Sequence, residues 1–66
     1  MDDLGSDIRA RRRDLGLSQR DLAELSDTSE RFVRDLEQGK ASVRLDKAVA
    51  VLSTLGLDLR AVARHR

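Results

Sequence analysis

Arginine and lysine are the residues of this chain whose type and spacing most directly indicate a chemistry. Four arginines lie between residues 9 and 13, and five further basic residues follow at Arg20, Arg31, Arg34, Lys40 and Arg44. Guanidinium and ammonium groups neutralise phosphates, so a face on which they gather would suit a nucleic acid. The formal net charge is only +1, and the total charge therefore does not indicate such a partner. The distribution is more informative, because a nearly neutral protein can still present one basic face.

Residues suited to catalysis or metal binding are scarce. The chain has no cysteine, which excludes disulfides and thiolate zinc sites, and its single histidine is His65. The four glycines lie at predicted helix ends, so none belongs to a glycine-rich phosphate loop. The carboxylates have simpler roles as helix caps and surface charges. We therefore expect no enzyme, no catalytic residue, no cofactor and no metal.

The length of 66 residues allows one domain. A domain of this size is marginally stable alone and usually needs disulfides, a metal or a second subunit. Because the first two are missing from the sequence, we expect a homodimer. No run approaches the ~18 apolar residues of a membrane span, and no apolar segment of a secretion signal follows the N-terminus. We expect a cytoplasmic protein that does not bind membranes.

Two predicted helices carry apolar residues at helical spacing near the ends of the chain. The first covers residues 3–15, has Leu4, Ile8 and Leu15 on one stripe, and ends at Gly16. The other covers residues 45–55. Its apolar residues at helical spacing are Leu45, Ala48, Val49, Leu52 and Leu55.

Two shorter helices are predicted between them. One begins after Ser18, which has the spacing of a capping box with Asp21, and it ends near Asp27, a residue type that tolerates a left-handed backbone. The other begins after Ser29, which can cap it, and ends at Gly39. The residues expected to face inward are Leu22, Ala23 and Leu25 in the former and Phe32, Val33 and Leu36 in the latter.

The tail changes period at residue 57. Leu57, Leu59, Ala61 and Ala63 alternate with Asp58, Arg60, Val62 and Arg64, which is more typical of a strand than of a helix. Such a strand would have no partner within one chain, and an unpaired edge is unstable. We therefore expect it to pair with the same segment of a second chain across a two-fold axis, with a fifth helix as the alternative. The predicted organisation is an all-α domain of four to five helices over residues 3–56 and a dimerisation tail over residues 57–66.

The two central helices have the lengths and the short connection of a helix-turn-helix pair. The second helix of such a pair fits the major groove of DNA, where its outward side chains near the N-terminus reach base edges. The spacing places Arg31, Arg34, Asp35 and Gln38 on the outward face of this helix. Two short helices in succession are also common without any such role, so the pattern alone leaves the function open.

Two sequence motifs resemble those of the Cro/phage-repressor (XRE) helix-turn-helix family. They are LGLSQRDLA at residues 15–23 and FVRDLEQGK at residues 32–40. The segment VRLDK at residues 43–47, with the apolar residues at 52 and 55–57, is similar to the HipB-like antitoxin branch of that family.

The resemblance extends over about residues 8–59 and implies a lambda-repressor-like fold that binds DNA. The chain departs from the family pattern in the turn of the helix pair. Asp27 stands where the family has glycine, and Ser26 stands where it has an apolar residue. Both changes are compatible with a turn, although they make it less typical.

The resemblance places seven residues at DNA-contacting positions: Gln19, Ser29, Glu30, Arg31, Arg34, Lys40 and Arg44. Gln19 would contact a phosphate and brace the recognition helix, while Lys40 and Arg44 would touch the DNA backbone. Arg31 or Arg34 would hydrogen-bond O6 and N7 of a guanine.

Other charged residues have two interpretations. Glu30 would either accept a hydrogen bond from a cytosine amine or stabilise the first turn of its helix. The arginines of residues 9–13 would either form a solvated face or contact phosphates through Arg12 or Arg13. Glu37 is expected to form a structural ion pair with an arginine of the first helix.

The resemblance implies a repressor that binds palindromic double-stranded operator DNA as a homodimer. Similarity to the HipB-like branch implies an antitoxin that controls its own operon and binds a HipA-like serine/threonine kinase toxin. Two alternatives remain at this point. One is a phage- or plasmid-type repressor without a toxin, and the other is a helix-turn-helix domain used only for protein–protein binding.

Overall fold

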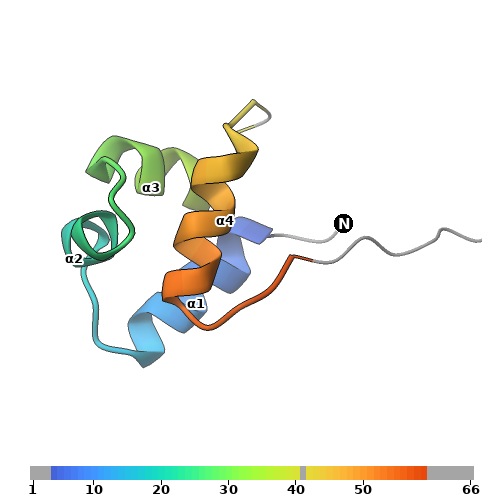
Figure 1. Cartoon of the computed structure of the whole chain (residues 1–66). Coiled ribbons are helices and arrows are strands. Elements are labelled where there is room, and N and C mark those ends of the chain that lie inside the picture. The colour runs from blue at the N-terminus through green and yellow to red at the C-terminus, as the bar shows by residue number, and fades with distance from the viewer. Residues whose placement is uncertain (1–3, 41, 60–66) are drawn as a thin grey trace, which may run out of the picture.

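Residues 4–40 and 42–59 are described by the computed structural model, and within them the chain forms four helices and no strand. The helices are α1 (Leu4–Asp14), α2 (Gln19–Leu25), α3 (Glu30–Glu37) and α4 (Leu45–Thr54). α3 packs against both α1 and α2, and α2 also contacts α4 (Figure 1). The all-helical prediction is confirmed for this part of the chain. None of these helices is long and apolar enough to cross a membrane.

The predicted C-terminal strand falls largely outside the described residues. Residues 57–59 are described and are not in a strand. Residues 60–66 lie outside the described part, so the strand across a two-fold axis and the alternative fifth helix both stay predictions.

One apolar cluster joins all four helices. Its members are Ile8, Leu22, Ala23, Val33, Leu36, Ala48, Val51, Leu52 and Leu55, each less than 5% exposed. Phe32 is half-buried and packs against this cluster, as the sequence predicts. The helix pair α2–α3 is therefore packed against α1 and α4 through this cluster.

The inward face of α4 differs from the prediction. Val51 is fully buried, whereas Leu45 and Val49 are 64% and 42% exposed. The inward face of α4 consists of residues 48, 51, 52 and 55. The helix is therefore rotated about its axis compared with the orientation predicted from the sequence. The prediction was wrong for Leu45 and Val49.

Two more predicted core residues, Leu15 and Leu25, are 45% and 63% exposed. Leu15 follows the end of α1, and the buried position one turn earlier belongs to Arg12. Leu25 is the last residue of α2, and the buried residue beside it is Ser26, whose Oγ donates to the carbonyl of Leu22 at 2.7 Å. In both cases a polar residue with a hydrogen-bond partner occupies the interior.

Gly5 lies in the first turn of α1 for a packing reason. It is buried, and a Cβ at this position would lie 2.7 Å from the carbonyl oxygen of Leu36. Since real Cβ atoms do not approach a carbonyl this closely, only glycine lets the start of α1 rest on the end of α3.

Candidate nucleic-acid interface

Serine side chains cap both helices of the pair. The Oγ of Ser18 accepts from the backbone N–H of Asp21 at 2.9 Å, and Oδ2 of Asp21 accepts from the N–H of Ser18 at 2.9 Å. The predicted capping box is therefore confirmed. The hydrogen bonds that the carboxylate of Asp21 accepts from Ser18, above all from its backbone N–H, lower the pKa of Asp21. At α3, the Oγ of Ser29 accepts from the N–H of Phe32 at 2.9 Å.

The turn between α2 and α3 is held by its own hydrogen bonds. Asp27 has a φ of 57°, the left-handed conformation in which the family has glycine. Before Asp27, the Oγ of Ser26 donates to the carbonyl of Leu22 in α2. After it, the N–H of Thr28 donates to the carbonyl of Ala23 at 2.9 Å. The hydroxyls of Ser26 and Thr28 are 3.0 Å apart and hydrogen-bonded. The residues that depart from the family pattern therefore still form a fixed turn.

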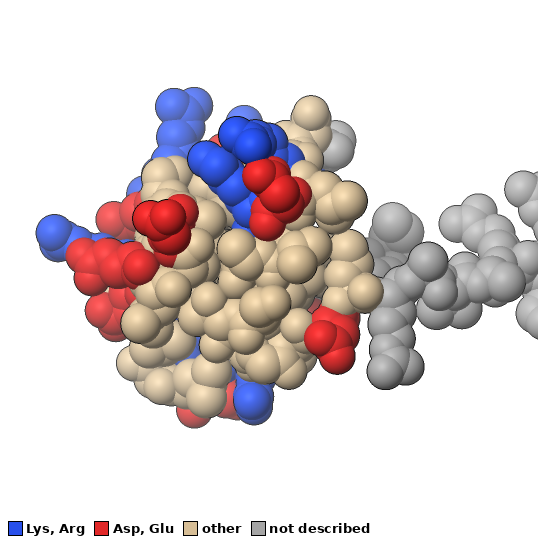
Figure 2. Space-filling view, in the orientation of Figure 1, with Lys and Arg blue, Asp and Glu red and all other residues tan. Residues whose placement is uncertain are grey.

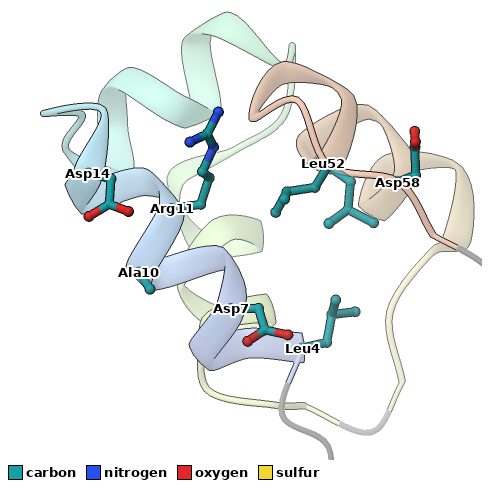
Figure 3. A pocket seen from close by; sticks show the side chains of 8 residues that line it. Leu4, Asp7, Ala10, Arg11, Asp14, Leu52 and Asp58 are labelled. Atoms are coloured by element: carbon teal, nitrogen blue, oxygen red, sulfur yellow. The ribbon is translucent and has the colours of Figure 1, made fainter.

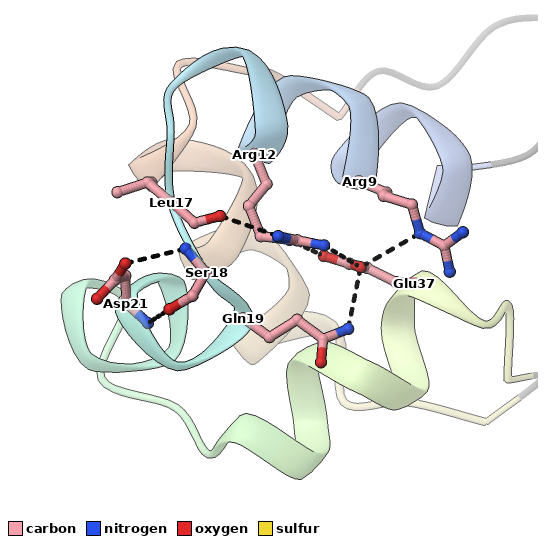
Figure 4. A network of polar contacts seen from close by, with 7 residues as sticks. All are labelled: Arg9, Arg12, Leu17, Ser18, Gln19, Asp21 and Glu37. Carbon is pink, nitrogen blue, oxygen red and sulfur yellow. Dashed lines mark hydrogen bonds and ion pairs between the residues drawn. The ribbon is translucent and has the colours of Figure 1, made fainter.

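Glu37, at the end of α3, is the centre of a buried polar network (Figure 4). Its side chain is 0% exposed. Nε of Arg12 donates to Oε2 at 2.6 Å, and Nη2 donates to Oε1 at 3.0 Å. Nε2 of Gln19 donates to Oε1 at 3.1 Å, and Nε of Arg9 lies 3.5 Å from the same oxygen. The predicted ion pair between Glu37 and the first helix is confirmed.

The network sets the charge state of both partners. Burial raises the pKa of Glu37, but the hydrogen bonds from Arg12 and Gln19 outweigh it, and the net pKa is below the usual value. The hydrogen bond to Glu37 in turn raises the pKa of Arg12 despite partial desolvation. Both groups are therefore charged at neutral pH, and they tie α3 to α1 and to the start of α2.

Two arginines of α1 hold other segments of the chain through hydrogen bonds. Arg12 is 8% exposed and is occupied by Glu37, so it is not available to a phosphate. Nε of Arg11 donates to the carbonyl of Leu55 at 2.9 Å, at the end of α4. Arg9, Arg11 and Arg13 are exposed, in agreement with the predicted solvated face. Arg12 is the exception, and its predicted phosphate contact is wrong, whereas that of Arg13 stays a prediction. Residue type alone cannot tell a buried guanidinium from a surface one.

The residues predicted to read bases do lie on one exposed face. Ser29, Glu30, Arg31 and Arg34 are all exposed, at the N-terminal half of α3. Nη2 of Arg34 is 3.9 Å from Oε2 of Glu30, a loose pair that favours the helix-stabilising interpretation of Glu30. Arg31 forms no ion pair with any residue in 4–40 or 42–59. Its guanidinium is therefore free for a ligand as far as the described residues go.

A shallow groove of about 290 Å³ joins α3 to the start of α4. It is lined by Ser29, Arg31, Phe32, Asp35, Ser42, Val43, Arg44 and Lys47. The predicted contacts Arg31 and Arg44 thus come together, while Lys40 is exposed but does not line the groove. Lys47 was missed by the sequence prediction, although its position three residues after Arg44 was a usable signal. In Figure 2 basic side chains gather over this end of the molecule, with acidic ones beside them.

Gln19 and Arg44, two further predicted contacts, are also held by other side chains of the protein. Gln19 is partly buried and braces α3 through Glu37, as predicted, while its phosphate contact stays a prediction. Nε and Nη2 of Arg44 donate to Oδ1 and Oδ2 of Asp46 at 3.1 and 2.8 Å. These hydrogen bonds lower the pKa of Asp46. A phosphate would therefore have to compete with Asp46 for Arg44.

Comparison with protein families agrees with this geometry. The model of the XRE-type helix-turn-helix family HTH_3 matches residues 8–62. The chain belongs to this helix-turn-helix family. The predicted resemblance is thereby confirmed at the level of the family, and the all-helical arrangement around α2 and α3 is that of a helix-turn-helix protein.

Two relatives support the assignment to the helix-turn-helix family. A protein of Sinorhizobium fredii, described as an uncharacterized HTH-type transcriptional regulator, y4mF, is 36% identical over 61 residues, which are 92% of this chain and 80% of y4mF. The crystal structure of ClgR, the clp gene regulator of Corynebacterium glutamicum, matches with a TM-score of 0.72 and 34% identity over 83% of this chain. The match covers 58% of the ClgR chain.

Proposed function

We propose that this chain is a sequence-specific DNA-binding transcriptional repressor whose helix α3 lies in the major groove. Membership of the helix-turn-helix family and similarity to transcriptional regulators support DNA binding and regulation. The observation that carries the proposal is the exposed N-terminal half of α3, held in a fixed orientation by the buried network around Glu37. A recognition helix needs both properties, because base edges are read only from a set distance and angle.

Within this proposal Arg31 is the principal base reader. It is the second residue of α3, is exposed, and pairs with no described carboxylate. A guanidinium in this state can form two hydrogen bonds with O6 and N7 of guanine. Arg34 reaches a neighbouring base only when it leaves the loose contact with Glu30, so its contribution is smaller.

The remaining predicted contacts position the protein on the duplex. Lys40, Arg44 and the newly identified Lys47 provide cations for phosphates beside α3. Ser29 is the N-cap of α3, where an exposed helix N-terminus favours an anion. Gln19 provides a further phosphate contact at the start of α2.

Repression from a palindromic operator requires two copies, whose α3 helices lie about 34 Å apart, one turn of DNA. We further propose that the copies form a homodimer and that the protein is the antitoxin of a toxin–antitoxin operon with a HipA-like kinase partner. The support for this finer role is the similarity of residues 43–57 to the HipB-like branch. An adjacent kinase-like reading frame and co-purification of its product would be the supporting observations, and their absence would favour a repressor without a toxin.

Selection of bound fragments from a random DNA pool tests the function directly. We expect a palindromic consensus from the wild type. For Arg31→Ala we expect an affinity loss of roughly 1–3 kcal/mol and a relaxed preference at one base position in each half-site. The matched control is Arg20→Ala, which removes the same charge from α2, where Arg20 is paired with Glu24. The control should leave the base preference at every position unchanged.

Salt dependence separates DNA binding from a role in protein–protein binding alone. Affinity for the selected site should fall with salt with a slope of about −0.9 for each phosphate neutralised. No consensus, or binding that is insensitive to salt, would contradict the proposal.

A further inference from the structure

A second groove, of about 360 Å³, lies on another part of the molecule, between α1 and the end of α4. Leu4 of α1 and Leu52 of α4 point toward its centre (Figure 3), and Leu57 lines it beyond the end of α4. Leu52 is only 2% exposed, while Leu4 and Leu57 are half-buried. The floor of the groove is therefore apolar and open to a ligand.

Three carboxylates surround this floor, from Asp7, Asp14 and Asp58. None of them forms an ion pair or a hydrogen bond with any residue in the described ranges. Arg11 lies between Asp7 and Asp14 on the same face of α1 and also lines the groove, where its Nε donates to the carbonyl of Leu55. Three carboxylates and one guanidinium give the groove a net formal charge of −2. The groove thus combines an apolar floor with a net negative charge.

We propose that this groove binds residues 60–66 of a second copy of the chain. The sequence of that segment, RAVARHR, contains three arginines around a short apolar run. Its charge is opposite to that of the three aspartates, and its apolar residues match the floor of leucines. The proposal concerns assembly of the protein and does not depend on DNA binding.

The spacing of the charges agrees on the two sides. Asp7 and Asp14 are two helical turns apart, which is about 10 Å along the axis of α1. Arg60 and Arg64 would lie about 13 Å apart in an extended segment. Both arginines can therefore reach a carboxylate while the residues at 61–63 cover the leucines between them.

The occupant is the segment of a second copy rather than the chain's own segment. Leu57 and Asp58 are themselves part of the groove wall, so the chain would have to reverse its direction directly after them. Residues 59–63, LRAVA, contain none of the glycine, proline, asparagine, aspartate or serine that tight turns favour. A segment from a second copy needs no such turn, and a two-fold arrangement forms the contact twice.

Sedimentation equilibrium of the full chain without DNA tests this proposal. The groove variant is Asp7→Asn/Asp14→Asn, and the segment variant is Arg60→Gln/Arg64→Gln. We expect each to raise the dimer dissociation constant about tenfold, because four exposed ion pairs are lost from each dimer. The control Asp27→Asn/Asp35→Asn removes two carboxylates that lack described partners but lie outside the groove, and it should dimerise as the wild type does.

Mixing the two variants distinguishes the occupants of the groove. A dimer of one groove variant and one segment variant retains one intact groove with one intact segment. We therefore expect the mixture to dimerise more tightly than either variant alone. Helical content measured by circular dichroism should be the same for all variants, which separates lost assembly from lost folding.

Three outcomes would overturn the proposal. The first is a wild type that stays monomeric. The second is a groove variant that dimerises normally while removal of residues 60–66 abolishes the dimer, which would favour strand pairing between the tails. The third is a mixture no tighter than its components, which would favour the chain's own segment. A monomeric wild type would also contradict the proposed homodimer. None of the three outcomes alters the base preferences measured with α3 variants, so the proposed DNA binding and the groove contact can fail separately.

Discussion

The guanidinium of Arg12 and the carboxylate of Glu37, 25 residues apart in the sequence, are joined by two hydrogen bonds of 2.6 and 3.0 Å. Arg12 also donates through Nη1 to the carbonyl of Leu17 at 2.9 Å, and so holds the connection that leads to α2. This one side chain therefore fixes the end of α3 and the entry to α2 together. The orientation of the proposed recognition helix depends on it.

Truncation of Glu37 should strongly destabilise the fold. In Glu37→Ala the guanidinium of Arg12 stays buried without its counter-charge, and removal of one partner of such a pair typically costs about 3–5 kcal/mol. Urea denaturation followed by circular dichroism measures the loss. Glu24→Ala is the control, because Glu24 is 71% exposed and its pair with Arg20 is loose, and it should change the unfolding free energy by less than about 1 kcal/mol. Equal effects of the two substitutions would contradict the structural role of the network.

The carboxylate of Glu37 should also make the unfolding free energy depend on pH in the acidic range. The pKa of Glu37 is lower in the folded chain than in the unfolded chain, because Arg12 and Gln19 outweigh the effect of burial. Its contribution is therefore complete above the unfolded pKa, about 4.3, and is lost as the pH falls through the folded pKa. We expect the difference in unfolding free energy between the wild type and Glu37→Gln to be largest at pH 7 and to shrink below about pH 4.5. A difference that stays constant down to pH 3 would show that the charge of Glu37 does not matter.

The helix caps and the turn conformation were the features of this fold that the sequence predicted best. The capping box of Ser18 and Asp21, the cap at Ser29 and the left-handed backbone at Asp27 were all predicted from the sequence and are confirmed. Each depends on residues within a few positions of one another, so a short stretch of sequence contains all the required information.

Features that depend on packing between distant segments were less predictable. The sequence shows several arginines in α1 but not which one is buried, because that depends on where Glu37 lies in space. The choice of Val51 over Val49 as a core residue likewise depends on how α4 is turned against the other helices. At the site, the outward face of α3 was predictable from helical spacing, whereas the groove shared by Arg31 and Lys47 requires the position of α4.

Substitution of Gly5 separates packing from helix propensity. In a helix, alanine is more favourable than glycine by up to about 1 kcal/mol, so propensity alone predicts that Gly5→Ala stabilises the protein. The structure predicts the opposite sign, because the new methyl group would meet the carbonyl oxygens of Leu36 and Glu37. We expect a loss of about 1–3 kcal/mol in unfolding free energy. Denaturant unfolding decides between the two, and a gain in stability would contradict the close contact between α1 and α3.

Asp46 should restrain DNA binding, since it holds the guanidinium of Arg44 through two hydrogen bonds. Asp46→Asn removes this competition and a negative charge beside the groove, so we expect about threefold tighter binding to the operator, the effect of one exposed ion pair. The variant Arg44→Ala and the double variant Arg44→Ala/Asp46→Asn complete a double-mutant cycle. If Asp46 acts through Arg44, its substitution should have little effect once Arg44 is alanine. An equal gain in both backgrounds would mean that Asp46 repels DNA directly, and the pair with Arg44 would then have no part in recognition.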